Sequence, residues 1–370
     1  LDAAGIWCIS FKPGSDSQIR SVLEIAEDHP GKQIIMQVEG GKAGGHHSWE
    51  DLNGLLERNY ARIRRHDNII LCAGGGIGLQ EQAHQLLMGN WHEGGKCMPV
   101  DGVILGTRLM ACSEAKTSHQ IKELLVEING TKDWVEKHDF NAGMTSGQSQ
   151  LGADVHYADN KTARVADFID QISDLNEEDI LEKTDEIIAR IDKTAKPFFG
   201  HVKEMTYTAV LQRMVELMAP GDMPEHFIHD APFFDATYRV RVFNFARRMV
   251  ERLAMHESKE LSKILKLESS KVLDDPELFL KKFLAEFSNA DVKLHPEDVD
   301  YFFNICRMPG KPVNFVPVID KNIKRWFKSD SLWQAHDPRY SAEQVLTIPG
   351  PEAVKGITRV DEPIASILKG

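Results

Sequence analysis

The sequence lacks long apolar runs, an excess of positive charge and clustered cysteines. No apolar run approaches the length of a membrane span, and no charged segment followed by an apolar one resembles a leader. The formal charge of −12 at pH 7 argues against nucleic acid or an anionic membrane as a partner, because a polyanion is bound by a basic face. The five cysteines are scattered without a CxxC pair, so we expect reduced thiols in a cytoplasmic protein.

The length of the chain indicates more than one domain. The chain has 370 residues, enough for a large core. It starts at Leu1 rather than at methionine, so we expect a piece of a longer polypeptide. No low-complexity segment occurs.

Short apolar runs alternate with amphipathic stretches from residue 7 to about residue 117. The predicted strands are 6–11, 33–38, 68–73 and 100–105, and three of the predicted helices are 49–65, 80–88 and 118–128. A further helix follows the first strand, with Ser15 or Asp16 as its cap and an apolar face of Ile19, Val22, Leu23 and Ala26. Apolar strands that alternate with amphipathic helices predict a parallel sheet. Both a doubly wound sheet and a (β/α)8 barrel fit this pattern, and in both the ligand lies beyond the carboxyl ends of the strands.

The composition changes twice along the rest of the chain. We predict four ranges: 1–129 as the α/β domain, 130–159 as a glycine-rich bridge, 160–310 as a helical subdomain, and 311–370 as a linker or the edge of a next domain. The last range contains short extended segments with proline. The fold class is therefore α/β followed by a mostly α-helical region and a short mixed extended segment.

Glycine clusters follow three of the predicted strands. The cluster from Gly74 to Gly78 comes after a strand and before a helix, which is where backbone amides can hold a phosphate. Gly106 and Thr107 end the next strand and would add amides and a hydroxyl. The motif is not GxGxxG, because Leu79 stands at the third glycine position. We expect a phosphate site here, and tight packing turns are the alternative.

Two histidines follow the glycines after the second strand. Gly44 and Gly45 precede His46 and His47, so a ligand could lie on bare backbone beside an imidazole. His46 is the better placed of the two, and His47 is expected to support the loop or to begin the helix. A solvent-exposed turn with a structural histidine is the alternative.

Metal ligation is not expected. No carboxylate or second histidine lies at i, i+4 spacing in the helix after His47. Asp154, His156 and Asp159 resemble a ligand set, but Asp and His in loops are commonly turn and cap residues.

Several segments resemble one enzyme family. VEGGKAGGHHSWEDL, LCAGGGIG and VDGVILGTRLMACSEAKTS are similar to the FMN-dependent enoyl reductase domain of type I fatty acid synthases, in the bacterial form of mycobacteria and corynebacteria. The similarity continues through SGQSQLGADVH and GKPVNFVPVID to IPGPEAVKGITRVDEP, so it covers nearly the whole chain. Stand-alone flavin enoyl reductases and nitronate monooxygenases, which share the AGGH and GTR elements, are more distant.

The resemblance implies a fold and a set of roles. Residues 1–129 would be the C-terminal half of a (β/α)8 TIM-type barrel that binds FMN. NAD(P)H would reduce the flavin, which would pass hydride to a 2-enoyl thioester on an acyl carrier protein. By position, His46 corresponds to the catalytic histidine. The cofactor-binding positions are Gly44, Gly45, Gly74, Gly75, Gly76, Gly106 and Thr107.

The resemblance also implies partners and limits. We expect other domains of the same synthase and a homo-oligomer as partners, and no metal. Because half of the barrel would lie upstream, this piece alone is expected to bind FMN weakly and to be inactive, with open sheet edges that favour self-association. A nitronate monooxygenase-like oxidase and a purely architectural piece of the synthase are the alternatives.

Overall fold

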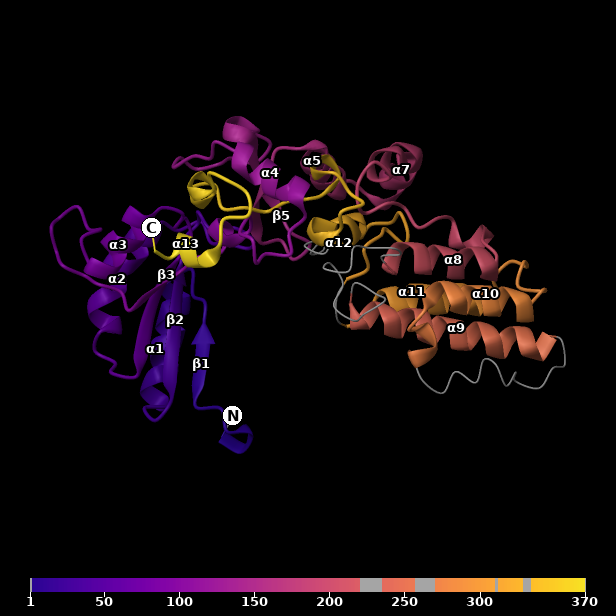
Figure 1. Ribbon diagram of the computed structural model, residues 1–370, viewed down its shortest axis with the longest axis horizontal. Coiled ribbons are helices and arrows are strands. Elements are labelled where there is room, and N and C mark those ends of the chain that lie inside the picture. The colour runs from indigo at the N-terminus through magenta and orange to yellow at the C-terminus, as the bar shows by residue number, and fades with distance from the viewer. Residues whose placement is uncertain (1, 220–234, 257–269, 310–311, 329–333, 370) are drawn as a thin grey trace. The chain divides into compact units, whose positions relative to one another are not determined.

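The computed structural model describes residues 2–219, 235–256, 270–309, 312–328 and 334–369. The chain forms two compact units, one of Leu1–Asp167 with Leu346–Gly370 and one of Phe168–Val345 (Figure 1). These units divide the chain differently from the four predicted ranges. Of residues 311–370, expected to be a linker or the edge of a next domain, residues 346–370 belong to the sheet-bearing unit and the others to the second unit.

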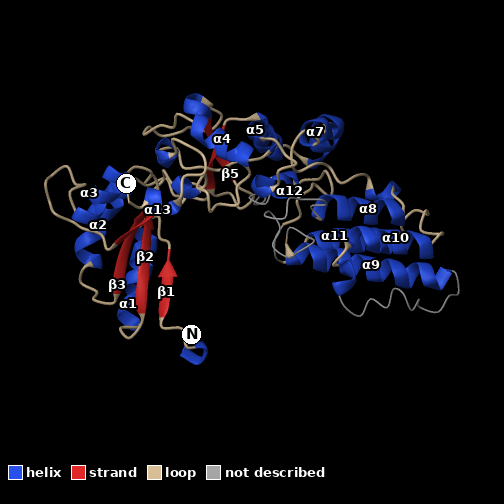
Figure 2. Ribbon diagram, in the orientation of Figure 1, coloured by secondary structure: helices blue, strands red, loops and turns tan. Residues whose placement is uncertain are grey.

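A four-stranded parallel sheet organises the first unit (Figure 2). Its strands are β1 (Cys8–Phe11), β2 (Gln33–Glu39), β3 (Ile69–Gly74) and β4 (Gly102–Ile104). They lie in chain order, β1-β2-β3-β4. The register pairs Glu39 with Gly74, and Gly74 with Ile104. The predicted parallel α/β arrangement is therefore confirmed, and the turns after the last three strands meet at one edge.

Amphipathic helices pack on this sheet. They are α1 (Asp16–Asp28), α2 (Leu52–Ile63) and α3 (Gln80–Met88). Two further helices follow in the chain: α4 (His119–Glu127), which contacts residues 353–356, and α5 (Lys161–Ser173), in which the boundary between the units falls. A short helix, α13 (Ile364–Ile367), lies near the C-terminus. The hydroxyl of Ser15 caps α1 by accepting the amide of Gln18, as the sequence predicts. The predicted apolar face of α1 is buried in full (Ile19, Val22, Leu23 and Ala26).

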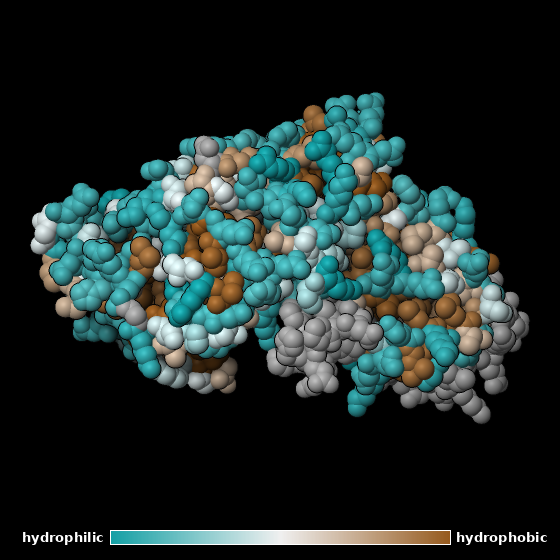
Figure 3. Space-filling model, turned by 45° about the horizontal axis from the view of Figure 1, so that its top comes forward, coloured by the Kyte–Doolittle hydropathy of each residue, from teal (hydrophilic) through white to brown (hydrophobic). Residues whose placement is uncertain are grey.

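The two faces of the sheet differ in burial. Along β2, Ile34, Met36 and Val38 are fully buried in the core that includes α1 and α2, while Ile35 and Gln37 between them are only half-buried. Successive side chains of a strand point to opposite faces, so one face is covered by helices and the other is partly open. Hydrophobic surface also shows between hydrophilic side chains on this unit (Figure 3).

Residues 130–159, predicted as a glycine-rich bridge, contain a hairpin. Strands β5 (Met144–Gln148) and β6 (Asp154–Ala158) pair antiparallel. Both are largely buried, yet they carry the polar side chains of Thr145, Ser146 and His156 at buried positions. The two strands could not be predicted, because this part of the sequence has neither a continuous apolar run nor an alternation of apolar and polar residues.

The second unit is helical. Its helices are α6 (Glu177–Glu182), α7 (Thr184–Ile191), α8 (Tyr207–Met218), α9 (Ala236–His256), α10 (Pro276–Glu286), α11 (Pro296–Cys306) and α12 (Ile323–Phe327). Helices α8 to α11 run alongside one another (Figure 1). The apolar spacing of Ile180, Ile187 and Ile191 is that of one helix, but α6 and α7 are separate, and between them the Thr184 hydroxyl donates to the Leu181 carbonyl at 2.7 Å. Within the described residues, no helix is long and apolar enough to cross a membrane.

A buried carboxylate ties the helices of this unit together. Asp298 on α11 is 1% exposed. It accepts hydrogen bonds from the Tyr207 hydroxyl at 2.5 Å, from Nε of Arg252 at 2.9 Å and from Arg248. Burial alone would raise the pKa of Asp298, but the hydrogen bonds from Arg252, Tyr207 and Arg248 outweigh burial and hold it below its usual range. The carboxylate therefore joins α8, α9 and α11.

We expect Asp298→Asn to lower the free energy of unfolding by about 3 kcal/mol, since removing one partner of a buried ion pair leaves the others uncompensated. Urea denaturation followed by circular dichroism measures the change. Asp300→Asn, on the exposed face of the same helix, is the matched control and should shift the free energy by less than about 0.5 kcal/mol. Equal effects of the two substitutions would contradict the role of the buried carboxylate.

Candidate functional site

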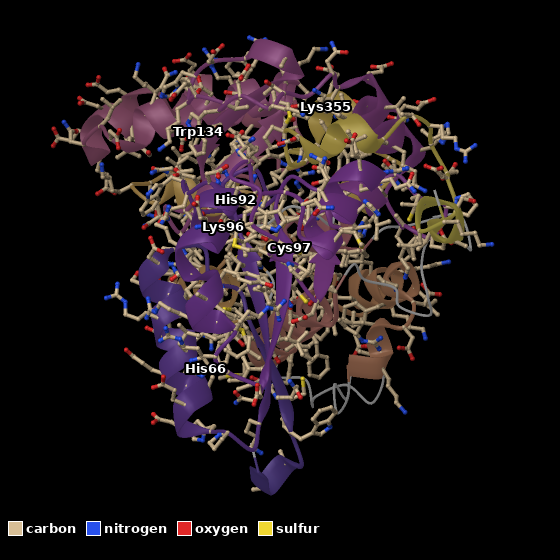
Figure 4. The ribbon with its side chains drawn as sticks, turned by 90° about the vertical axis from the view of Figure 1, so that its left-hand side faces the viewer. His66, His92, Lys96, Cys97, Trp134 and Lys355 are labelled. Atoms are coloured by element: carbon tan, nitrogen blue, oxygen red, sulfur yellow. The ribbon has the colours of Figure 1, made fainter. Side chains whose placement is uncertain are left out.

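Three turns lie side by side where β2, β3 and β4 end. The amide of Gly40 donates to the carbonyl of Gly74 at 3.2 Å, which joins the turn after β2 to the turn after β3. In Figure 4, Trp134 lies toward this end of the sheet and His66, which precedes β3, lies toward the other end. The glycine and histidine clusters singled out from the sequence thus gather at one edge.

The turn after β3 depends on glycine for two reasons. Gly75 and Gly76 have φ of +91° and +90°, which side chains disfavour. A Cβ on Gly75 would also lie 2.9 Å from the carbonyl oxygen of Gly40. The side-chain oxygen of Gln82 then accepts the amides of Gly78 at 3.0 Å and Leu79 at 2.9 Å, which closes the start of α3.

Residues 346–356 form a wall against these turns. The amide of Gly350 donates to the Thr107 hydroxyl at 2.8 Å, and the amide of Gly45 donates to the Ile348 carbonyl at 3.1 Å. A Cβ on Gly356 would lie 1.9 Å from the carbonyl oxygen of Gly78. The two backbones approach too closely for any side chain at that point.

A cleft of about 570 Å³ opens beside the turns after β2 and β3. Its lining includes the backbone of Gly40, Gly41, Gly75 and Gly76, the starts of α2 and α3, and side chains of both charge signs. Glu352 reaches into this lining, where its carboxylate pairs with Lys42 at 3.1 Å and accepts from the Gln82 amide at 2.7 Å. Trp49 and Trp134, which are 72% and 45% exposed, also line it. The volume suits a small-molecule ligand.

His46 and His47 have different surroundings. His46 is exposed, and its backbone forms a bridge with Val155 of β6. His47 is half-buried, and its ring stacks on that of His156 with the centroids 4.0 Å apart. The helix expected directly after His47 begins later, at Leu52, with Asp51 as its cap. His46 is the more exposed of the two, although it is not among the residues that line the cleft, and His47 lies in a ring cluster with His156 and Trp134.

His156 is buried and its side chain is fully engaged. Its Nε2 lies 2.9 Å from the carbonyl of Gly41, and its Nδ1 lies 2.8 Å from the Ser146 hydroxyl. Since a carbonyl only accepts, Nε2 is assigned the proton. Burial, reinforced by the neighbouring His47, lowers the pKa of His156 to about 4, and burial also lowers the pKa of His47. The pair is therefore neutral at pH 7.

The predicted cofactor residues divide into two groups. Gly75 and Gly76 line the cleft. Gly44 and Thr107 instead pack against the wall, where a Cβ on Gly44 would lie 2.6 Å from the Thr107 hydroxyl. Of the remaining predicted positions, Gly74 ends β3 and Gly45 directly precedes His46. Gly106 borders open space, because a Cβ added there would meet no atom within 4 Å.

Sequence reasoning did not find His156 or Glu352 as part of this site. His156 contacts Gly41 across 115 residues, and Gln82 contacts Glu352 across 270 residues. No local pattern could have indicated either contact. Among the described residues, no group of three or more His, Cys, Asp or Glu side chains could hold a metal ion.

The comparisons with known proteins place the chain in one family. Residues 33–368 match the family described as fatty acid synthase subunit beta/Fas1-like, helical, so the chain belongs to that family. It is 34% identical over 395 residues to the fatty acid synthase subunit beta of Aspergillus oryzae, and 33% identical over 395 residues to that of Saccharomyces cerevisiae. All of this chain is covered in both cases, but only 19% of either relative. The chain thus spans about a fifth of the length of these curated relatives.

Similarity to solved structures is weak. FabK from Thermotoga maritima is 18% identical, with a TM-score of 0.28, over 52% of this chain and 56% of that chain. A mutant of the same protein gives 19% identity and a TM-score of 0.25, over 44% and 50%. These scores are too low to support an argument about fold or site.

We expect Gly356→Ala to detach residues 346–356 from the turns, because a Cβ cannot fit 1.9 Å from a carbonyl oxygen. Limited proteolysis should cut this segment at least tenfold faster, and the melting temperature should fall. Gly31→Ala is the control, since a Cβ there meets nothing within 4 Å. Equal protection of the segment in both variants would show that the wall does not depend on this contact.

We expect the chain to lose stability as the pH falls from 6.5 toward 4. The unfolded chain binds a proton at His156 near pH 6.5, whereas the folded chain binds it only near pH 4. Protonation therefore favours the unfolded state by about 2 kcal/mol at pH 5. Urea denaturation at pH 7 and pH 5 should show this loss in the native chain and not in His156→Gln. The control His119→Gln, at an exposed position, should lose as much stability between pH 7 and pH 5 as the native chain. If His156→Gln also loses this amount, the pH dependence does not come from His156.

Proposed function

We propose that the chain is the enoyl reductase segment of a multifunctional fatty acid synthase, reducing 2-enoyl thioesters carried by acyl carrier protein. One observation carries the proposal: bare glycine backbone lines a ligand-sized cleft where parallel strands end, and the exposed His46 lies on the same turn as the lining residues Gly40 and Gly41. Ligands of parallel α/β folds bind at that edge. Membership of the fatty acid synthase beta family and the motif resemblance support the same chemistry.

The sheet supports the proposal that the fold is the C-terminal half of a (β/α)8 barrel. Its four strands lie in chain order without reversal, whereas a doubly wound sheet reverses direction at a switch point. Right-handed crossovers in one direction place all helices on one face. The half-buried second face of β2 is the face that would line the inside of a barrel.

The residues present fit FMN in part. Gly75 and Gly76 offer bare backbone at the cleft, and Gly106 has open space where a side chain would stand, as a phosphate would require. The Thr107 hydroxyl accepts from Gly350 and retains its own proton to donate. The negative charge of the Glu352 carboxylate near Gly76 would repel a phosphate, and the ion pair of Glu352 with Lys42 offsets that repulsion. Gly44 packs within the protein and is not proposed to touch the phosphate.

When bound, FMN would carry hydride from NAD(P)H to the β-carbon of the enoyl thioester. The chain's own part is to stabilise the charge that develops on the thioester oxygen. An exposed imidazole at His46 can donate a hydrogen bond or a proton to that oxygen. His47 does not compete for this role, because its ring is stacked on His156.

The narrower predictions belong to this proposal. The relatives above are fungal beta subunits, and these relatives do not support the predicted bacterial type of synthase. The cytoplasmic location, the homo-oligomer and the other synthase domains as partners stay predictions.

The test uses the full-length protein with FMN bound. We expect His46→Ala to slow reoxidation of the reduced flavin by a crotonyl thioester by about 100-fold or more, with FMN affinity changed less than threefold. Anaerobic stopped-flow absorbance measures the rate. His84→Ala is the control, because His84 is an exposed histidine on α3. If only oxygen, and no enoyl thioester, reoxidises the native flavin, the protein is an oxidase and the proposal is wrong.

A further inference from the structure

The turn that carries His46 is held by β6. His46 and Val155 form an antiparallel bridge, and the amide of His47 donates to the carbonyl of Asp154 at 3.2 Å. In such a pairing, consecutive side chains point to opposite faces. The ring of His47 is therefore directed away from the face on which His46 is exposed.

His156 secures this arrangement at two points. Its ring stacks on His47 at 4.0 Å and an interplanar angle of 12°, and its Nε2 donates to the carbonyl of Gly41 at 2.9 Å. The bridge register places Gly45, which has no side chain, opposite His156. Trp134 packs edge-on against both rings, with centroids 6.1 Å away.

The two contacts lie on either side of the glycines that precede His46. Gly41 begins the turn and His47 ends it, so one imidazole fixes both ends of a segment rich in glycine. Glycine-rich backbone has the largest conformational freedom to lose. Without an outside anchor, His46 would sample many orientations.

We propose that His156 is the positioning residue for His46: by stacking on His47 and donating to Gly41, it keeps His46 on the exposed side of the turn, opposite to His47. This inference rests on the proposed function. His156 itself does not touch the ligand, because it is buried with both ring nitrogens engaged inside the protein.

The kinetic test compares three substitutions of His156 in the full-length, FMN-bound protein. We expect His156→Ala to lower kcat for the enoyl thioester by roughly 10- to 100-fold, with KM and FMN affinity changed less than threefold. His156→Phe keeps a ring to stack, and His156→Gln keeps an N–H for Gly41, so each should recover part of kcat. If His156 were only structural, His156→Ala would lower the amount of folded protein, but kcat would not fall at constant KM. His156→Phe and His156→Gln would then recover no kcat.

Amide hydrogen exchange gives an independent measurement. In His156→Ala, the His47 amide should exchange at least tenfold faster, while amides of α1 keep their native rates. His84→Ala should leave the rates of both unchanged. Native exchange at His47 in His156→Ala would overturn the inference.

The two hypotheses fail in different ways. If His46→Ala does not slow the reaction, the proposed function fails and the inference fails with it. If His46→Ala slows the reaction and folded His156→Ala keeps native kcat, only the inference is wrong.

Discussion

The close approach of residues 346–356 to the turns after the strands is the contact on which the site depends. It is a backbone contact, made possible by glycine on both sides, since neither Gly78 nor Gly356 leaves room for a Cβ. The hydrogen bonds of Gly350 and Ile348 then fix the segment against Thr107 and Gly45. Without this wall, the edge of the sheet would be a set of open loops.

The wall also sets the charge of the site. Glu352 brings a carboxylate to a place where the turn amides alone would favour an anion, and Lys42 and Gln82 hold that carboxylate in position. The cleft therefore combines bare backbone, a paired charge and two exposed tryptophans. Such a lining suits a ligand that has both a flat ring and polar groups better than a purely apolar one.

Local features of this fold could be predicted from the sequence. The apolar spacing in α1 identified its buried face, and α3 begins and ends where the pattern predicts. Periodicity succeeds here because each helix buries one stripe against the core. It failed for β5 and β6, whose buried positions include polar side chains that are satisfied by distant partners, such as His156 with Gly41.

The site could be predicted only in part for the same reason. His46 and the glycines stand next to strand ends, so their location at one edge follows from the parallel topology. Contacts that cross more than a hundred residues, such as those of His156 and Glu352, leave no local signal. The distinction between His46 and His47 followed from the opposite directions of neighbouring side chains, and the His156 ring is the physical reason for it.

The first unit is discontinuous, which has a consequence for its biosynthesis. Its last segment, Leu346–Gly370, follows a complete second unit in the chain. The ribosome therefore makes the sheet and its turns well before the residues that cover them, and the helical unit can fold in the interval. The entropy of closing so long a connection rises only slowly with its length, so the inserted unit costs little in stability. Its effect is on timing, because the candidate site can be completed only when synthesis has passed Gly356.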